Sequence, residues 1–391
     1  MPTERTYDVV LVGASGFAGE LTAAYLARNA PTACRWAIAG RNRAKLAAVR
    51  DRLTATTSSC ATLPVLHADI SDPESLREIA EAARVVITTV GPYLQYGEPL
   101  VAACAAAGTD YVDLSGEPQF VDQMYLRHHD TAAATGARIV HACGFDSIPY
   151  DLGTYYTVRQ LTGNGPVSVT ATLRLRSTFS GGTYASMLTA VSRPREMRRA
   201  AQERNRTERR PANKTIRTPF GRPHRDPATG NWLVPMPTLD PQLVARSAAA
   251  SDEYGTNFTY RQYVAFRHLP TLAALGVGLG TAILLSQVPP ARRALGRLRA
   301  PGTGPSPAQR ADSWFSVNFV GSANGNQVHT EFSGGDPGYE ETAKMLGESA
   351  LCLAFDELPA TAGQVTSATA MGQALLERLR SAGLTIQRVA T

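Results

Sequence analysis

Residues 1–160 alternate between short apolar runs and longer segments whose apolar residues recur at helical spacing. The apolar runs are YDVVLV, RWAIAG, LPVLHADI, RVVITTVG, DYVDLSG and ARIVHACG. Helical segments such as 43–53 and 73–83 lie between them, and Asp72 and Pro73 provide a cap and a first-turn residue for the second. This alternation is typical of βαβ units. The chain is therefore predicted to open with an α/β domain, a Rossmann doubly wound parallel sheet.

Residues beyond 150 follow a different pattern. Segment 167–177 alternates like a strand with one polar face, and 314–334 is predicted to form a hairpin around an Asn324-Gly325 turn. These strands predict a second, α+β domain that carries an antiparallel sheet, and helical spacing returns near the C-terminus. The predicted boundaries are a Rossmann domain at 1–150, an α+β substrate domain at 151–354 and a helical segment at 355–391.

Three glycines follow the first predicted strand with the spacing G-x-x-G-x-x-G. Between a strand and a helix, such glycines serve a tight turn, the approach of backbone to pyrophosphate, and the packing of helix on strand. The N–H groups at the helix start would then face the phosphates. A glycine turn that binds nothing is the alternative. The candidate cofactor-binding residues are Gly13, Ala14, Ser15, Gly16, Phe17 and Gly19.

The residues after the second and third strands indicate which dinucleotide binds. NAD-binding sheets place an Asp or Glu after the second strand, but here Arg41 stands there, followed by Asn42, Arg43 and Lys45. A guanidinium suits a 2′-phosphate, so NADP(H) is favoured over NAD(H), with Arg41, Asn42 and Lys45 as contacts. Asp69, after the third strand, either contacts the adenine or caps a helix.

Several long motifs resemble those of a known family. They are GPYLQYGEPLVAACAAAGTDYVDLSGEPQF, HACGFDSIPYDLG, SGGTYAS, FSGGDPGYEETAKMLGESALCLA and PATAGQVTSATAMG. Over nearly the whole chain the sequence resembles the saccharopine dehydrogenase-like oxidoreductases, in particular the trans-acting enoyl reductases. The resemblance implies reduction by NADPH of a conjugated carbon–carbon double bond on a lipid or polyketide-derived chain, in trans to a synthase. It also implies that the last helix packs back on the first domain.

Two other functions stay open within this resemblance. Relatives that reduce imines would need arginines for substrate carboxylates, and Arg174 and Arg176 lie on one strand face. A non-catalytic, lipid-associated protein that binds the nucleotide is the other alternative. The substrate is expected to be a small or lipid-like molecule. Whether it is carrier-bound, and whether the chain forms a homodimer, is left open.

Catalysis is expected at the ends of the fourth and sixth strands. The phenol of Tyr93 could donate a proton or stabilise an enolate, or it could pack against the nicotinamide without proton transfer. Asp146 could orient the substrate with Ser147, although an Asp before Ser-Ile-Pro also fits a helix N-cap. The candidates there are Gly91, Pro92, Gly144 and Phe145 for the cofactor, and Tyr93, Asp146 and Ser147 for catalysis.

Three further ionisable residues lie near the fifth and sixth strands. Asp113 and Glu117 flank the end of the fifth strand, where they could belong to the site or be acidic residues that stabilise a helix start. His141 lies in an apolar run and is interpreted as a core histidine.

The net charge of +6 is concentrated in residues 193–226, which hold eleven Arg and one Lys against three Glu and one Asp. Such a stretch could bind RNA, anionic lipid or an acidic carrier protein, or it could be a solvated helix and loop. The run RPREMRRAAQERNRTERR contains no aromatic residue for base stacking, so no nucleic-acid partner is predicted.

Composition limits the number of domains and the classes of protein that the chain can belong to. With 391 residues, of which 43% are hydrophobic and 18% charged, the chain can bury two cores. Five cysteines without C-x-x-C spacing indicate neither a disulfide framework nor a zinc site, and no metal is predicted. The charged start MPTERTYD is not a signal peptide, so a cytoplasmic location is expected.

One segment, 269–290, is uncharged over about the 20 residues that a bilayer-spanning helix needs. Arginines follow it in the run ARRALGRLR, which could lie at an anionic lipid surface. The segment could contact a membrane or line a tunnel for an acyl chain, or it could be a buried or dimer-interface helix.

Overall fold

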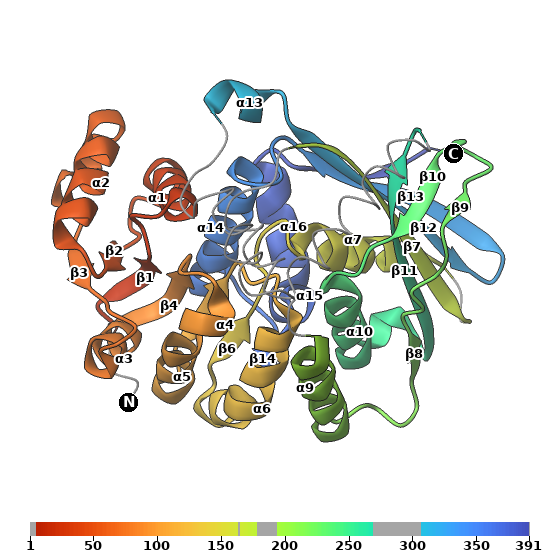
Figure 1. The fold of residues 1–391 in the computed structure, drawn as a ribbon, viewed down its shortest axis with the longest axis horizontal. Coiled ribbons are helices and arrows are strands. Elements are labelled where there is room, and N and C mark those ends of the chain that lie inside the picture. The colour runs from red at the N-terminus through yellow and green to blue at the C-terminus, as the bar shows by residue number, and fades with distance from the viewer. Residues whose placement is uncertain (1–4, 163–164, 178–193, 269–305, 391) are drawn as a thin grey trace, which may run out of the picture. The chain divides into compact units, whose positions relative to one another are not determined.

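A computed structural model describes most of the chain (Figure 1). The described residues are 5–162, 165–177, 194–268 and 306–390. They divide into two compact units: unit 1 is Met1–Asp146 with Tyr339–Ala382, and unit 2 is Ser147–Gly338 with Gly383–Thr391. The apolar segment 269–290 and the motif SGGTYAS lie outside the described residues. Within the described ranges, no helix is both long and apolar enough to cross a membrane.

Unit 1 contains the predicted doubly wound parallel sheet, in the strand order β14-β6-β5-β4-β1-β2-β3. Each neighbouring pair in it is parallel. The central strands are buried on both faces, which explains why their sequences are continuous apolar runs. The strands are β1 Tyr7–Val12, β2 Trp36–Gly40, β3 Val65–His67, β4 Ala83–Thr88, β5 Asp110–Asp113, β6 Arg138–Val140 and β14 Gly363–Val365.

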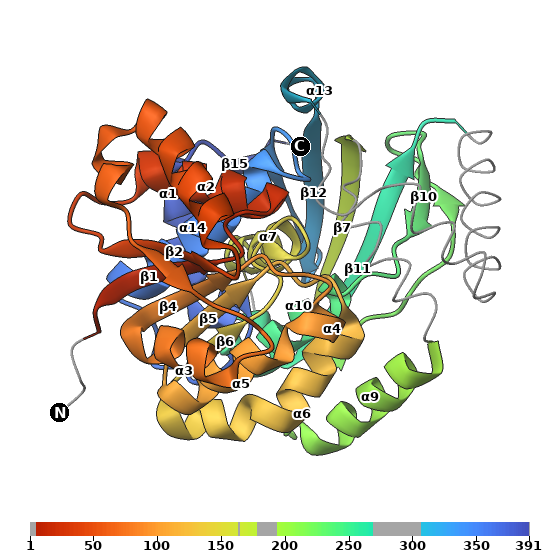
Figure 2. The ribbon, with the colours of Figure 1, turned by 60° about the vertical axis from the view of Figure 1, so that its left-hand side comes forward.

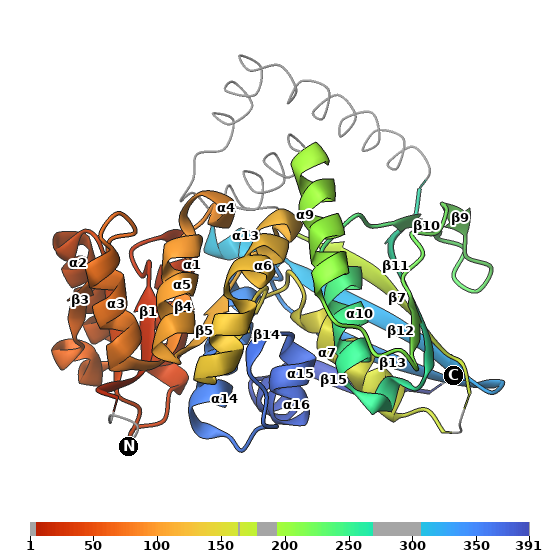
Figure 3. The same ribbon diagram turned by 90° about the horizontal axis from the view of Figure 1, so that it is seen from below.

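Helices cover both faces of this sheet. α1, α2 and α14 form one layer, and α3, α5 and α6 form the other (Figures 1 and 3). Asp72 caps α3 as predicted, because its carboxylate accepts the backbone N–H of Glu74 at 3.2 Å. The helices are α1 Phe17–Asn29, α2 Arg43–Thr56, α3 Pro73–Ala82, α4 Tyr93–Tyr96, α5 Glu98–Ala107, α6 Pro118–Thr135, α14 Glu340–Phe355, α15 Ser367–Ala370 and α16 Gly372–Ser381, with a 3₁₀ turn η1 at Ser58–Thr62.

The segment Tyr339–Ala382 is part of the core of unit 1. Strand β14 extends the sheet beside β6, and α14 packs on β4 and β5. The backbone N–H of Gln364 donates to Nδ1 of His129 at 3.0 Å, and its side-chain amide donates to the carbonyl of Val121 at 3.1 Å. Arg138, paired with Asp110, also donates to a carbonyl of α14. The segment therefore completes both an edge and a face of the sheet.

Unit 2 is built on a larger sheet in the order β15-β13-β12-β7-β11-β10-β9, with β8 beside β11. Figure 2 shows the strands β12, β7, β11 and β10 of this sheet in a row. Most neighbours are antiparallel, while β11 runs parallel to β7 and β8, and long connections join it to both strands. The strands are β7 Val167–Arg176, β8 Thr215–Arg217, β9 His224–Arg225, β10 Trp232–Pro235, β11 Asn257–Phe266, β12 Trp314–Ala323, β13 Asn326–Gly334 and β15 Thr385–Val389.

The helices of unit 2 pack on one another and on this sheet. Helix α7 crosses β12 and β13, and a Cβ at Gly153 would lie 2.3 Å from the ring of Phe319, so only glycine allows this approach. The predicted hairpin is confirmed, with Asn324 and Gly325 at φ 50° and 80° in its turn. The helices are α7 Ile148–Arg159, α9 Pro194–Thr207, α10 Asp240–Ala250 and α13 Pro307–Ala311, with a 3₁₀ turn η2 at Asp252–Tyr254.

Candidate functional site

In the turn between β1 and α1, the fold itself requires two of the three glycines. Gly13 has φ +88°, and a Cβ there would lie 2.7 Å from Cγ2 of Val90. A Cβ on Gly19 would lie 2.2 Å from the carbonyl oxygen of Gly13, a contact that no side chain can make. The Gly13 carbonyl also accepts the N–H of Gly16 at 3.0 Å, which closes the turn. Gly13 and Gly19 therefore form the tight turn and the close helix–strand packing.

Gly16 differs from these two glycines. It is exposed, its φ of −86° is open to any residue, and a Cβ there would meet nothing nearer than the Gly13 carbonyl at 3.5 Å. It is also the N-cap residue of α1, which has no side-chain cap. Nothing in the turn itself requires glycine at this place. A bare backbone at a helix N-terminus is suited to a close-approaching phosphate, so the turn fits the pyrophosphate of a dinucleotide.

The neighbours of Gly16 complete this turn. Ala14 is buried, and Ser15 is half-buried. The ring of Phe17 packs edge-on against that of Tyr339, with centroids 4.8 Å apart. The first residue of α1 is thus held by the residue that precedes α14.

Charged residues follow β2 and β3. Arg41 and Lys45 are exposed, and the Asn42 side chain caps α2 by accepting the N–H of Lys45 at 3.0 Å. The pKa of Asp69 lies below its ordinary value mainly because its carboxylate accepts the N–H and hydroxyl of Ser71, and the positive charge of Arg41 adds to this. The cap of α3 is Asp72, so Asp69 does not serve that purpose. Its contact with an adenine stays a prediction.

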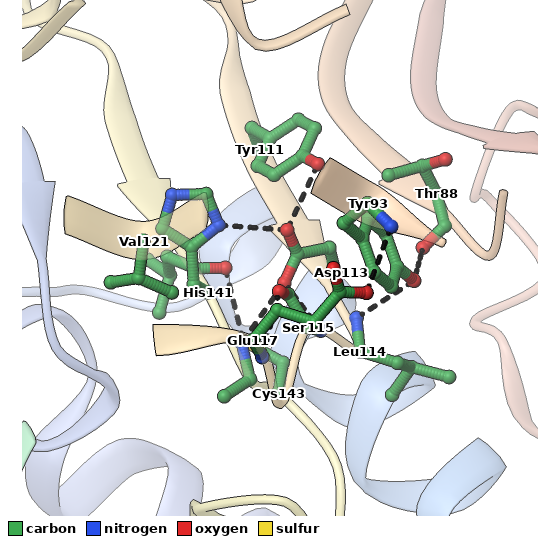
Figure 4. A network of polar contacts seen from close by, with 12 residues as sticks. Thr88, Tyr93, Tyr111, Asp113, Leu114, Ser115, Glu117, Val121, His141 and Cys143 are labelled. Atoms are coloured by element: carbon green, nitrogen blue, oxygen red, sulfur yellow. Dashed lines mark hydrogen bonds and ion pairs between the residues drawn. The ribbon is translucent and has the colours of Figure 1, made fainter. Parts of the chain in front are cut away.

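Tyr93 connects the chain segments after β4 and β5 (Figure 4). Its hydroxyl donates to the carbonyl of Thr88 and accepts the N–H of Leu114, both at 3.1 Å. The side chain is only 6% exposed and packs on the ring of Phe120. Burial, with a smaller effect of the nearby Asp113 charge, raises the pKa of the phenol well above 10. Both hydrogen-bonding directions of the hydroxyl are therefore used within the fold.

Glu117 holds the same region from the other side. Its buried carboxylate accepts the backbone N–H groups of Tyr93 and Leu94, each at 3.0 Å. It lies at the N-cap position of α6, as its place in the sequence suggests, but its side chain caps α4 instead. The carboxylate therefore binds backbone N–H groups of a segment distant in the sequence, and not those of the helix that directly follows it.

Asp113 is the centre of a buried polar network at the ends of β5 and β6 (Figure 4). One carboxylate oxygen accepts the N–H groups of Ser115 and Ala142 at 2.9 and 3.0 Å. The other accepts the hydroxyl of Tyr111 at 2.9 Å and pairs with Nδ1 of His141 at 2.7 Å. His141 is 3% exposed, in agreement with its interpretation as a core histidine. The network fixes both strand ends beside the site.

The residues after β6 lie against the same region. A Cβ on Gly144 would come within 2.6 Å of Leu114 and 2.9 Å of Thr342, whose hydroxyl accepts the N–H of Phe145 at 3.1 Å. The carboxylate of Asp146 lies over Gly116, 3.0 Å from where a Cβ would be placed. Asp146 is thus close to the chain segment that follows β5.

Ser147 begins unit 2, and it, not Asp146, is the N-cap of α7. Its hydroxyl is buried, makes no capping hydrogen bond and has no hydrogen-bond partner in the described parts of the chain.

Comparison with known proteins decides the family. Residues 9–140 match the model of the saccharopine dehydrogenase NADP binding domain. A trans-acting enoyl reductase of Mycobacterium ulcerans is 38% identical over 416 residues, and one of Mycobacterium bovis 39%, each covering 98% of both chains. The chain belongs to the trans-acting enoyl reductase family. The resemblance of its motifs is thereby confirmed, as is NADP(H) as the cofactor of this domain.

The fold of this family member is also that of saccharopine dehydrogenase. The apo, L-Glu-forming enzyme of Saccharomyces cerevisiae superposes with a TM-score of 0.57 at 12% identity, covering 98% of this chain and 100% of the other. At this identity the similarity shows the shared architecture alone.

The structure brings most of the predicted site residues of unit 1 to one edge of its sheet. The glycine turn follows β1, Arg41 and Asp69 follow β2 and β3, and the segments 91–93 and 144–146 follow β4 and β6. In a doubly wound sheet this edge is where ligands bind. Sequence reasoning missed the supporting contacts. These are the polar network of Asp113, the packing of Tyr339 on Phe17 and the hydrogen bond between Thr342 and Phe145. The one available signal was the position of Asp113 and Glu117 at the end of β5.

Proposed function

We propose that the chain is an NADPH-dependent reductase of a conjugated carbon–carbon double bond on a lipid or polyketide-derived substrate, acting in trans to a synthase. The observation that carries the proposal is its similarity, over 98% of both chains, to proteins named trans-acting enoyl reductase. The glycine turn with its exposed Gly16 supports it. When bound, NADPH supplies the hydride.

Each residue of the site has a proposed part. Backbone at Gly16 binds the pyrophosphate, and Arg41 binds the 2′-phosphate. Tyr93, Asp146 and Ser147 are proposed for the reaction centre. Because the Tyr93 hydroxyl is engaged by two backbone groups, its contacts favour a positioning role, in which it holds the chain after β4 and β5. The proton then comes from water or from the pair Asp146 and Ser147.

The arginines that an imine reductase would use are arranged on the outside of unit 2. Arg174 and Arg176 are exposed on β7. Arg176 pairs with Asp312 at 3.5 Å, and the guanidinium of Arg174 lies 5.9 Å from the ring centroid of Trp314. Because both arginines have such partners on the surface, they give no support to recognition of an amino-acid carboxylate.

Purified full-length protein is expected to oxidise NADPH when it is given a 2-enoyl thioester with a long acyl chain. The loss of reduced-nicotinamide absorbance measures the rate, and mass spectrometry of the acyl group identifies the saturated product. The saturated thioester is the matched control and should give no reaction. Turnover of a 2-oxo acid with an amine, without turnover of any enoyl thioester, would contradict the proposal.

NADPH is expected to bind at least about tenfold more tightly than NADH, a difference of about 1.4 kcal/mol. The reason is the exposed Arg41, whose charge suits a phosphate at the place where NAD-binding sheets carry a carboxylate. Arg41→Ala should remove most of this preference, and Arg50→Ala, on the following helix, should not. Affinities for both cofactors are measured by titration. Equal affinities in the wild type would end this assignment.

A further inference from the structure

Helix α9 presents a basic face to solvent. Arg195, Arg198, Arg199, Gln202 and Arg206 are exposed. At 100° per residue these five lie within about one third of the helix circumference. The two glutamates of the helix, Glu196 and Glu203, are seven residues apart and flank this face on one side. The face therefore carries four positive charges and no negative one. Below, it is called the α9 face.

The opposite side of α9 anchors the helix to the rest of unit 2. Ala200 and Arg204 are buried, with exposed fractions of 6% and 4%. Arg204 forms an ion pair with Glu208, and Glu208 pairs with Arg246 of α10 at 2.7 Å. Figure 3 shows α9 beside α10. The buried arginine is thus paired within the fold, whereas the arginines of the α9 face are held outward on a fixed helix.

The chemistry of the α9 face selects among anionic partners. It has no aromatic side chain on which a base could stack, which disfavours single-stranded RNA. It has no exposed apolar side chain to enter a bilayer, which disfavours a lipid surface. Arginines repeated along a helix suit discrete carboxylates, which they bind with two hydrogen bonds each. An acidic helix of a folded protein matches these features.

We infer that the α9 face is the docking surface for an acidic carrier protein that delivers the acyl thioester. The inference rests on the proposed function, because only a reductase acting in trans on a tethered chain needs such a partner. Docking by exposed charges accelerates association and weakens as salt rises.

The test reverses two charges of the α9 face in the full-length protein with Arg199→Glu and Arg206→Glu. We expect KM for a 2-enoyl group carried on a holo acyl carrier protein to rise at least about tenfold, because the reversed charges repel the acidic partner. KM for the same group on free pantetheine should not change. The double variant Arg267→Glu and Arg388→Glu, which makes the same charge change at exposed positions elsewhere in unit 2, should leave both values unaltered.

Binding is measured separately from turnover, by fluorescence anisotropy of the labelled carrier protein. If the reversed protein binds and uses the carrier as the wild type does, the inference is overturned. It is also overturned if the reversal abolishes binding to anionic phospholipid vesicles or to RNA while carrier binding persists. If the wild type binds the carrier and the reversed protein does not, but the wild type reduces neither thioester, the proposed function fails while the docking surface stands.

Discussion

Gly16→Val is expected to weaken NADPH binding by at least about a hundredfold, or roughly 2.7 kcal/mol, while the protein stays folded. The Cβ of the new residue has room in the turn, since its nearest neighbour would be 3.5 Å away, and φ −86° suits valine. The added methyl groups would occupy the space that the pyrophosphate needs at the start of α1. Titration with NADPH measures the affinity, and thermal unfolding without cofactor measures stability.

Gly19→Ala is the matched control for this experiment. Its Cβ would lie 2.2 Å from the Gly13 carbonyl oxygen, so we expect loss of soluble, folded protein and not a selective loss of binding. The two variants thus distinguish a glycine that ligand binding requires, Gly16, from one that folding requires, Gly19. A Gly16→Val protein that binds NADPH as the wild type does would show that the phosphates do not contact this turn.

Tyr93→Phe is expected to lower the free energy of unfolding by about 1–3 kcal/mol and to change kcat by less than about threefold. The substitution removes the acceptor of the half-buried Leu114 N–H and the donor to the buried Thr88 carbonyl, and it leaves the ring packing in place. Denaturant unfolding and the NADPH oxidation assay provide the two measurements. Because burial raises the pKa of Tyr93 well above 10, the activity should show no ionisation of this phenol below that pH.

Tyr96→Phe is the control for the loss of a phenol on the same short helix, because Tyr96 is 39% exposed. It should alter neither stability nor rate. If Tyr93→Phe instead lowers kcat about a hundredfold at unchanged stability, the phenol acts as the general acid, and water or the pair Asp146 and Ser147 no longer serves as the proton source.

Local pattern predicts the parts of this fold that depend on neighbours in sequence. The continuous apolar runs of β1 and β4 and the Asn324-Gly325 turn are such features, because burial on two faces and a positive φ each restrict residue choice locally. The site depends on contacts between distant segments. Nothing in the sequence around Glu117 shows that its carboxylate caps α4, because the direction of that side chain is set by the packing of α6 on α5.

The glycine turn is a local motif of the same kind. Its spacing assigns Gly13 to a tight turn, Gly16 to the approach of pyrophosphate and Gly19 to the packing of helix on strand, and the contacts that a Cβ would meet likewise separate Gly13 and Gly19 from Gly16. The positions of Tyr339 and Thr342 beside the turns could not be derived from periodicity, since these residues lie about 200 or more positions away in the chain and meet the turns only through α14.

The discontinuity of unit 1 has a consequence for biosynthesis. As the chain leaves the ribosome, β6 has its final neighbour on one side only, and the face that α14 covers stays open until Tyr339–Ala382 is made. Strands β7 to β13 of unit 2 are all synthesised within that interval. Unit 1 therefore stays incomplete until almost the whole chain has been made, and unit 2 then receives only its edge strand β15, beside β13. A chain that stops before β14 exposes an unpaired strand edge and apolar surface, the features by which chaperones and proteases select unfinished proteins.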